Sequence, residues 1–481
     1  METLSINNVD RISQLPDSLC HHVLSFLSAA DAGMTVFLSR RWRFLWYSSP
    51  VFNFDEKYFV NTISYSSPAN FLMFLEGTLT RRRWYFNHLG IEKFRIYMRM
   101  FYELSPLALN WVVFALNCNV KELVIINEGI DCPTIPCTLS DAIFVAKYIT
   151  KLEISHLYLE EISVSVNLPN LQELVLRSTL ISDSTLQKII FGCSIVRKIC
   201  LELLHGVEKF VISKETLLEL IVFRCLHVEF DIEYAPNLKL FAYEGRGIER
   251  HKIGISSLGN LRSLRLIEAR VTDSVLGDLV LEYPLLEELV IGYCSTVKKL
   301  LISSPKLECF VLYGCELLVE VKIDAPNLLK LEYRGELVNF SSVISSPLLE
   351  VSIHLERNNR SSSTDWYPKL KDLCEKLQYS KALFLACRED LDLIVPEKMR
   401  KSLLPQLHGL RHLKVKITIS LERNGWKLEE GLRWIFPCLR TLDIVSCFNC
   451  FENHYEYKED MLQLLGGTAG LSLEEHTVPG N

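Results

Sequence analysis

A leucine-rich motif repeats along most of this chain and constrains its fold more than any other feature. The motif reads Leu-x-x-Leu-x-Leu, often two residues after a proline, and a clear copy is Leu171, Leu174 and Leu176 after Pro169. Further copies begin at residues 196, 217, 238, 261, 286, 307 and 328, so one unit takes 21 to 25 residues. A unit of this length cannot bury its apolar side chains alone and becomes stable when neighbours stack on it. The repeats therefore predict a row of similar units that share one core.

Weaker copies of the motif extend this row in both directions. The alternation Leu-x-Leu is typical of a short strand with one buried face, so each copy predicts one strand. The array therefore spans most of the chain. The weaker copies begin at Ile91, Val120 and Leu152 before the central row, and at Leu348, Leu410 and Leu439 after it.

The longest and shortest units predict different connections between strands. The two 25-residue units carry a helix-start signal at the same offset, where Ser182 and Thr272 can each cap a helix that begins with an aspartate. The 21-residue units have no room for a helix, so we expect extended chain or a single turn there. Another shared position follows the last leucine of the motif by three residues and holds a thiol that can donate weakly to loop carbonyls. These thiols belong to Cys225, Cys294, Cys315 and Cys447.

The first 50 residues have a helical pattern instead. Pro16 stops an earlier helix and Asp17 can cap the next one. At 100° per residue, the apolar side chains that follow fall within one arc of about 160°. A second helical stretch near Asp31 leads to aromatic anchors beside arginines, which favour an interface. The segment is too small to bury its apolar surface alone, so it requires a partner. The arc comprises Leu19, Cys20, Val23, Leu24, Phe26 and Leu27, and the anchors are Trp42, Leu45 and Trp46.

The N-terminal run resembles the F-box, above all its plant form. The matching elements are Asp10 to Pro16, Leu24-Ser25-Phe26-Leu27, and Leu38 to Trp42 followed by Leu45-Trp46, and they cover residues 9–50. The sequence departs from the family between these elements, where Ser28-Ala29-Ala30 replaces a usual Pro-Thr-Lys stretch. Gly33 also lies in the second helix, where glycine costs up to ~1 kcal/mol relative to alanine.

The repeats resemble leucine-rich repeats, in which each Leu-x-Leu forms a parallel strand. Together the two resemblances imply an α/β chain, with an N-terminal helical F-box followed by a leucine-rich-repeat solenoid whose parallel strands line the concave face. A helix after Ser67-Pro68 is expected to join the two parts, and another from Pro106 to Leu116 precedes an early strand. The expected segments are an F-box at 9–50, a helical linker at 51–88, leucine-rich repeats at 89–355, a polar loop at 356–364, irregular C-terminal repeats at 365–465 and a disordered tail at 466–481.

Composition and charge exclude several classes of protein. The chain has 481 residues, 49% of them hydrophobic, and a net charge of −6, so neither nucleic acid nor an anionic membrane is an expected partner. No apolar run approaches the ~20 residues that a membrane span needs. The 15 cysteines are scattered, which favours a soluble protein of the nucleus, the cytoplasm or both. The basic run Arg81-Arg82-Arg83 is expected to be a solvated helix end.

No residue pattern predicts catalysis, a metal or a cofactor. Cys447, Cys450 and His454 have the spacing of half a zinc site, but a second pair is missing and Cys447 already occupies the repeat position. Neither a glycine-rich phosphate loop after a strand nor a Gly-x-Ser-x-Gly turn occurs. His21 and His22 lie on the polar side of the first helix and are expected to be solvated.

The resemblance implies a substrate-recognition subunit of an SCF (Skp–cullin–F-box) E3 ubiquitin ligase. The F-box would bind the Skp adaptor, and through it cullin, while the repeats hold an unidentified target protein and no bond chemistry takes place on the chain. One alternative is a non-degradative interaction scaffold, and another is an enzyme with an unrecognised pocket. The residues expected to carry or support adaptor binding are Leu15, Pro16, Leu19, Leu24, Leu27, Trp42, Leu45 and Trp46.

The target site is expected on the concave face, because residues between the repeat leucines point away from the stacked core. Several of these positions are apolar and would form an exposed stripe bordered by charges, which fits a protein-binding patch. A C-terminal segment or a loop folded over the stripe would cover the same residues. The expected target-binding residues are Ile221, Phe223, Val290, Val311, Tyr313 and Arg334.

Overall fold

A computed structural model describes most of the chain, and the chain divides into two compact units. Unit 1 comprises residues 1–235 and 251–257, and unit 2 comprises residues 236–250 and 258–481. The expected domain limits do not include this division, which falls inside the repeats. The described residues are 12, 14–63, 67–99, 105–128, 141–159, 161–225, 228–245, 253–255, 258–344, 348–357, 363–389, 392–400, 407–419 and 425–446.

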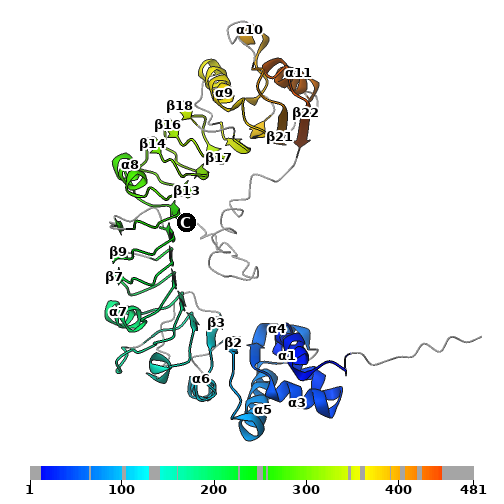
Figure 1. Cartoon of the computed structure of the whole chain (residues 1–481). Coiled ribbons are helices and arrows are strands. Elements are labelled where there is room, and N and C mark those ends of the chain that lie inside the picture. The colour runs from blue at the N-terminus through cyan, green and yellow to red at the C-terminus, as the bar shows by residue number, and fades with distance from the viewer. Residues whose placement is uncertain are drawn as a thin grey trace, which may run out of the picture. The chain divides into compact units, whose positions relative to one another are not determined.

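Unit 1 begins with helices, several of which start at a side-chain cap, whereas α1 follows Pro16 and has no such cap. The hydroxyl groups of Ser28, Ser39 and Ser67 each accept a backbone N–H of the helix that follows, which satisfies one donor that the first turn leaves unpaired. The helices are α1 (Asp17–Ser25), α2 (Ala29–Met34), the 3-10 helix η1 (Thr35–Phe37), α3 (Arg40–Ser48), α4 (Glu56–Thr62) and α5 (Pro68–Phe86) (Figure 1).

The rest of unit 1 stacks parallel strands in the register that the repeats predict. Leu152, Leu174 and Ile199 pair with one another across neighbouring strands and are buried. The main strands are β1 (Val51–Asp55), β2 (Lys93–Arg99), β3 (Glu122–Glu128), β4 (Lys151–Ser155), β5 (Glu173–Arg177), β6 (Lys198–Glu202) and β8 (Glu219–Phe223), in that order. The connections contain α6 (Ser105–Asn117), η2 (Asp141–Val145), α7 (Asp183–Gly192), and a small sheet of β7 (Lys209–Ser213), β9 (Glu229–Tyr234) and β11 (Ile253–Ile255).

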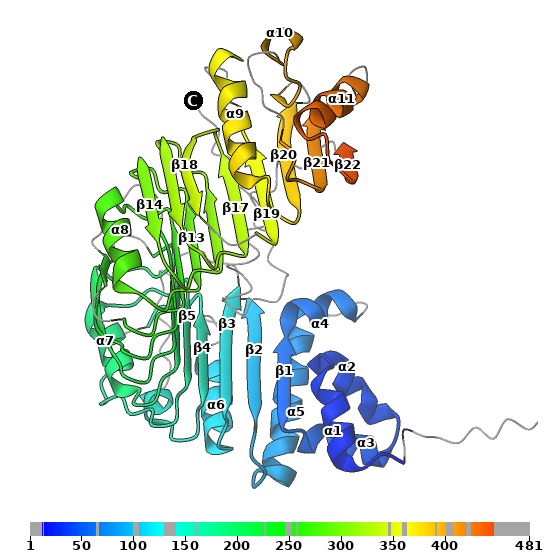
Figure 2. The same cartoon turned by 45° about the horizontal axis from the view of Figure 1, so that its top comes forward.

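Unit 2 repeats this organisation, and Figure 2 shows its strands side by side. Its main strands, all parallel, are β10 (Leu240–Glu244), β12 (Ser263–Ile267), β13 (Glu288–Gly292), β15 (Cys309–Tyr313), β17 (Lys330–Gly335), β19 (Glu350–Leu355), β20 (Leu383–Glu389), β21 (His412–Ile419) and β22 (Thr441–Ser446). The connections contain α8 (Asp273–Glu282), α9 (Ser363–Leu377), α10 (Glu397–Arg400), α11 (Gly425–Ile435), and a second sheet of β14 (Lys299–Ser303), β16 (Glu320–Asp324) and β18 (Asn339–Ile344).

The α/β repeat fold and the expected difference between long and short units are confirmed. Ser182 caps α7 and Thr272 caps α8 in the two 25-residue units. The short units are connected by extended chain, which forms the two small sheets. The cysteine position also behaves as expected: Cys225 Sγ lies 3.5 Å from the carbonyl oxygen of Leu201, and Cys294 Sγ lies 3.3 Å from that of Gly292. Each thiol therefore links a turn to a strand end.

A left-handed residue follows many of the main strands, which the sequence did not predict. His156, Ser178 and Leu203 have positive φ angles of 56°, 43° and 49°. Their N–H groups donate to the carbonyl at the end of the next strand over distances of 2.9, 2.8 and 2.8 Å. This hydrogen bond offsets the strain that a side chain suffers in the left-handed region. The sharp turn redirects the chain at the same point of successive units.

Two expected segments need correction. The linker 51–88 is only partly helical, because its first five residues form β1 and pair with β2. The polar loop 356–364 ends earlier than expected, since α9 begins at Ser363, and residues 358–362 lie outside the described part of the chain. The tail 466–481 also lies outside it. Among the helices that the structure describes, none combines the length and apolar character that crossing a membrane requires.

Removal of one repeat leucine should strongly destabilise unit 2. Leu289 is fully buried and pairs with Leu264 and Phe310 on the neighbouring strands. We expect Leu289→Ala to lower the free energy of unfolding by ~2–5 kcal/mol, because it removes buried methyl groups and leaves a cavity. Hydrogen exchange should show reduced protection in the strands of unit 2. The control Leu301→Ala removes a leucine that is largely exposed on β14 and should cost within ~0.5 kcal/mol. Protection lost mainly in residues 14–50 would contradict this assignment.

Candidate functional site

Helix α1 has two apolar sides rather than one continuous face. Cys20 and Leu24 are buried within the N-terminal helices, whereas Leu19, Val23 and Phe26 point to solvent. Leu19 is 49% exposed and Phe26 is 75% exposed. The predicted arc of about 160° is wider than one packing contact, so its edge remains uncovered. The exposed edge is available to a partner.

The segment that follows α2 exposes a second apolar group. Met34, Phe37 and Leu38 are all more than half exposed, and Phe37 is 78% exposed. Single exposed apolar side chains are ordinary, but several large ones within a segment of this size are typical of a binding surface. We call Leu19, Val23, Phe26, Met34, Phe37 and Leu38 the apolar helical surface. Of this set, only Leu19 is among the site residues expected from the sequence.

The expected tryptophan anchors lie in the core instead of on this surface. Trp42, Leu45 and Trp46 are buried, as is Leu24. The Trp46 ring packs against Phe52 and Phe74, with centroid distances of 5.4 and 6.3 Å. These side chains therefore hold the helices together, so they can support adaptor binding through the fold but do not lie on the surface that a partner would meet. Helical spacing identified one shared face, but it could not show that β1 and α5 cover it.

The remaining expected residues lie at the surface. Pro16 and Leu19 are exposed, while Leu15 and Leu27 are partly buried. Of the eight expected residues, these four stay candidates for direct contact.

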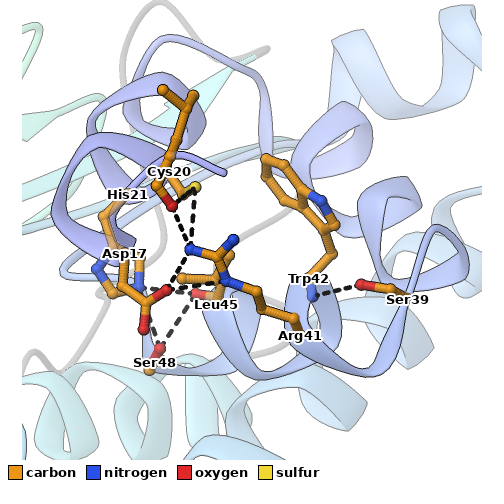
Figure 3. Close-up of polar contacts among 9 residues, drawn as sticks. Asp17, Cys20, His21, Ser39, Arg41, Trp42, Leu45 and Ser48 are labelled. Atoms are coloured by element: carbon orange, nitrogen blue, oxygen red, sulfur yellow. Dashed lines mark hydrogen bonds and ion pairs between the residues drawn. The ribbon is translucent and has the colours of Figure 1, made fainter. Parts of the chain in front are cut away.

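Arg41 attaches the start of α1 to α3 (Figure 3). Its Nη2 atom lies 2.6 Å from Asp17 Oδ1, and the same nitrogen donates to the backbone carbonyl of Leu15. The Cys20 thiol donates to this carbonyl as well, with a sulfur–oxygen distance of 3.7 Å. The hydrogen bond from Arg41 to the Asp17 carboxylate raises the pKa of Arg41, which keeps the guanidinium charged. This network holds the backbone carbonyl of Leu15, next to Pro16, against α1 and α3.

His21 is partly buried and hydrogen-bonded, whereas a solvated ring was expected. Its Nε2 atom lies 3.2 Å from the carbonyl oxygen of Leu45 and 3.1 Å from Ser48 Oγ on α3, as Figure 3 shows. Burial lowers the pKa of His21, which favours the neutral ring at this contact. His22 is exposed as predicted, and its ring meets Phe26 at 4.8 Å. The two histidines therefore have different roles on one short helix.

Gly33 is a packing requirement of α2 rather than a weakness. A Cβ atom at this position would lie 2.6 Å from the ring of Phe74 on α5, which is closer than such atoms approach. The glycine therefore lets α2 and α5 pack in direct contact. A larger residue would force the Phe74 ring to move, which opposes the gain in helix propensity that alanine would bring.

Arg82 is fully buried, so the prediction of a solvated basic helix end is wrong for this residue. Its guanidinium donates to three carbonyl oxygens, those of Tyr47 at 2.9 Å, Leu89 at 3.1 Å and Gly90 at 3.2 Å. Burial lowers the pKa of Arg82 to about 10. A signal was present in the sequence, because residue 82 follows the buried Leu75 and Leu79 at helical spacing. Arg81 and Arg83 are exposed as predicted.

The expected exposed stripe between the repeat leucines is buried. Ile221 and Phe223 in unit 1 and Val290, Val311 and Tyr313 in unit 2 are all at most 7% exposed. Neighbouring strands are only ~4.8 Å apart, so large side chains in register shield one another. Gly292, for example, leaves space that the ring of Tyr313 fills. These residues therefore do not form the exposed stripe that the target-site prediction required. The sixth residue, Arg334, is paired with Glu356 at 3.1 Å.

The described residues contain no group of three or more His, Cys, Asp or Glu side chains that could hold a metal ion. Cys447, Cys450 and His454, the candidate half-site of the sequence analysis, lie outside the described part.

Family models match both parts of the chain. The model of the F-box domain matches residues 12–54. The model of the leucine-rich repeats of the FBD-associated F-box protein At5g56370 matches residues 109–257, and that of the At1g61320/AtMIF1 leucine-rich-repeat domain matches residues 248–379. The helices around the apolar helical surface and the stacked strands thus each have a counterpart among known families.

Three similar proteins come from Arabidopsis thaliana. The putative F-box/LRR-repeat protein At3g28410 is 25% identical over 201 residues, which cover 41% of this chain and 38% of that protein. The F-box/LRR-repeat protein At1g55660 is 29% identical over 201 residues, covering 41% and 52%. The FBD-associated F-box protein At4g10400 is 26% identical over 341 residues, covering 67% and 77%. The match to At3g28410 thus spans about two fifths of that relative's length.

Proposed function

Because the chain is a plant-type F-box/leucine-rich-repeat protein, we propose that it is the substrate-recognition subunit of an SCF E3 ubiquitin ligase. The F-box binds the Skp adaptor, and through it cullin, while the repeats bind a target protein. The observation that carries the proposal is the apolar helical surface. Leu19, Phe26 and Phe37 are exposed on an F-box whose tryptophans are buried, so this surface needs a partner to exclude water.

The chain contributes position rather than chemistry in this proposal. An adaptor-bound receptor holds the lysines of a target close to a ubiquitin-loaded conjugating enzyme, which raises their effective concentration. No side chain of the receptor has to act as an acid, a base or a nucleophile. The proposal therefore assigns no catalytic residue and no cofactor to this chain, and it places the complex in the nucleus, the cytoplasm or both.

A set of hydrogen bonds from the buried Arg82 guanidinium to three backbone carbonyl groups, which we call the Arg82 clamp, supports this role. It joins α5 to the end of α3 through Tyr47 and to the chain before β2 through Leu89 and Gly90. A receptor that holds a target at a defined distance from the ligase needs a rigid connection at its F-box, because a flexible connection lowers the effective concentration.

Reconstitution tests the proposal. We expect the full chain, co-expressed with a plant Skp adaptor and cullin, to co-elute with both in size-exclusion chromatography. Proximity labelling in plant cells, compared with a form lacking residues 1–50, should then identify proteins whose ubiquitination depends on the F-box. Co-elution without any F-box-dependent ubiquitination would favour the non-degradative scaffold. Absence of adaptor binding by a folded chain would refute the ligase role.

A further inference from the structure

Cations on the leucine-free face of the main strands are neutralised within the chain from β4 to β17. We call this side, which carries the residues between the repeat leucines, the open face. Each Lys or Arg on the open face of these strands has a carboxylate oxygen within 4.0 Å. The positive charges are therefore neutralised by carboxylates of the same chain. The pairs are Lys151–Glu173, Arg177–Glu202 and Lys198–Glu219 in unit 1, and Arg265–Glu288, Lys330–Glu332 and Arg334–Glu356 in unit 2.

The last strands of unit 2 differ in this respect. Arg388 on β20 and Lys414 and Lys416 on β21 alternate with buried residues and therefore point to the open face. None of the three has a carboxylate within ion-pair distance in the part of the chain that the structure describes. Arg388 and Lys414 are exposed and Lys416 is partly exposed. A ligand can reach these charges without first breaking an internal ion pair.

Strand register brings these cations next to an aromatic group. His354, Ala386 and Lys416 are direct neighbours on β19, β20 and β21, which Figure 2 shows side by side. The ring of Phe384, two residues before Ala386 on the same face, lies 5.3 Å from that of His354 and is partly exposed. An aromatic ring beside accessible cations matches the composition of protein interfaces.

The pKa of His354 shows that positive charges lie close to its ring. Burial, Arg334 and Lys416, in that order of effect, lower the pKa of His354 to about 4. The imidazole is therefore neutral at physiological pH, and its Nε2 atom stays within 3.0 Å of Ser352 Oγ. Arg334 is already paired with Glu356, whereas Lys416 has no ion pair among the residues that the structure describes. The neighbourhood of Lys416 therefore favours an incoming anion, whereas Asp443 on β22 is the direct neighbour of Lys414 without an ion pair between them in the described part.

We propose that Phe384, Arg388, Lys414 and Lys416 form a docking surface for an extended acidic segment of a protein. This inference rests on the proposed function in one respect, that the segment belongs to the target of the ligase. Charge complementarity supports an acidic occupant, because no carboxylate of the described residues forms an ion pair with these cations. We call the four residues the acidic-segment surface.

The spacing of the lysines specifies the shape of the segment. Lys414 and Lys416 are two residues apart on one strand, which corresponds to ~6.6 Å. An extended peptide places alternate side chains at the same interval, so carboxylates at positions i and i+2 can each meet one lysine. Arg388 on the adjacent strand can bind a further carboxylate or a phosphate through two parallel hydrogen bonds. Phe384 provides the contact for an apolar residue of the same segment.

Fluorescence anisotropy with the purified full chain tests the surface. The probes are three labelled peptides of equal length around one leucine, with alternate positions occupied by glutamate, by glutamine or by phosphoserine. We expect the glutamate peptide to bind at least tenfold more tightly than the glutamine peptide, and its affinity to fall as salt rises. Preference for phosphoserine over glutamate would identify phosphate as the natural anion, and equal binding would assign an acidic segment of either kind. Equal affinity for the glutamine peptide would overturn the proposal.

Charge reversal with a matched control locates the binding. Lys414→Glu with Lys416→Glu should weaken glutamate-peptide binding at least tenfold, whereas Lys306→Glu with Lys322→Glu changes two exposed lysines of unit 2 elsewhere and should leave it unchanged. Thermal unfolding shows whether each variant folds. Co-elution with the Skp adaptor, measured on the same variants, should be normal. Loss of peptide binding in both double variants would overturn the assignment to this surface, whereas a lack of adaptor binding by the unchanged chain would count against the proposed ligase role instead.

Discussion

Leu19→Glu is expected to abolish binding of the Skp adaptor while the chain stays folded. Leu19 is half exposed on α1, so the charge costs little in the free protein. In a complex, the carboxylate would be removed from water without a partner, and truncation of an interface anchor alone loses ~2 kcal/mol or more. Phe26→Glu should act in the same way. Isothermal titration with purified adaptor should show at least a thirtyfold loss of affinity, which corresponds to ~2 kcal/mol.

Matched variants separate contact from folding. Leu281→Glu places the same charge on an exposed leucine of α8 and should leave adaptor affinity unchanged. Replacing Leu15 and Pro16 by alanine should also weaken binding, by ~2 kcal/mol or more for each anchor that is a hot spot. Trp42→Ala should instead lower the stability of the F-box by ~3–5 kcal/mol, because Trp42 is buried. Unchanged affinity of the Leu19 and Phe26 variants would remove the apolar helical surface from the adaptor interface.

Arg82→Met is expected to lower the free energy of unfolding by ~3–5 kcal/mol. The substitution retains most of the apolar stem but leaves the carbonyl oxygens of Tyr47, Leu89 and Gly90 without their donor in a buried place. Chemical denaturation measures the cost. Hydrogen exchange should show the greatest loss of protection at residues 44–55 and 86–93, on the two sides of the clamp.

Arg81→Met is the control for this experiment. Arg81 is exposed on the same helix, lies over the ring of Tyr47 at 5.7 Å and donates to Gly77 within its own helix. Its loss should cost less than ~1 kcal/mol. Equal destabilisation by the two variants would mean that the buried hydrogen bonds of Arg82 contribute no more than an exposed arginine.

The sequence by itself determined the repeat strands, several helices and their order, although it placed β1 in a helical linker. Repeat spacing predicted strands whose leucines pair in register, as Leu174 and Ile199 do, and the cap signals at Ser182 and Thr272 predicted α7 and α8. These features depend on local periodicity and on hydrogen bonds within a few residues, so the sequence records them directly. The F-box motif likewise located its helices.

Only the tertiary structure decided which side of each element meets water. Leu19 and Leu24 belong to one predicted arc, but α3 and β1 pack beside α1 and leave Leu19 exposed and Leu24 buried. Arg82 is buried and Arg81 exposed because the carbonyl groups near residues 47 and 89 reach only one of them. Periodicity gives the direction in which a side chain points from the axis of its helix or strand. The neighbours that cover it come from distant parts of the chain, so its exposure, and with it the candidate binding surfaces, follows from packing.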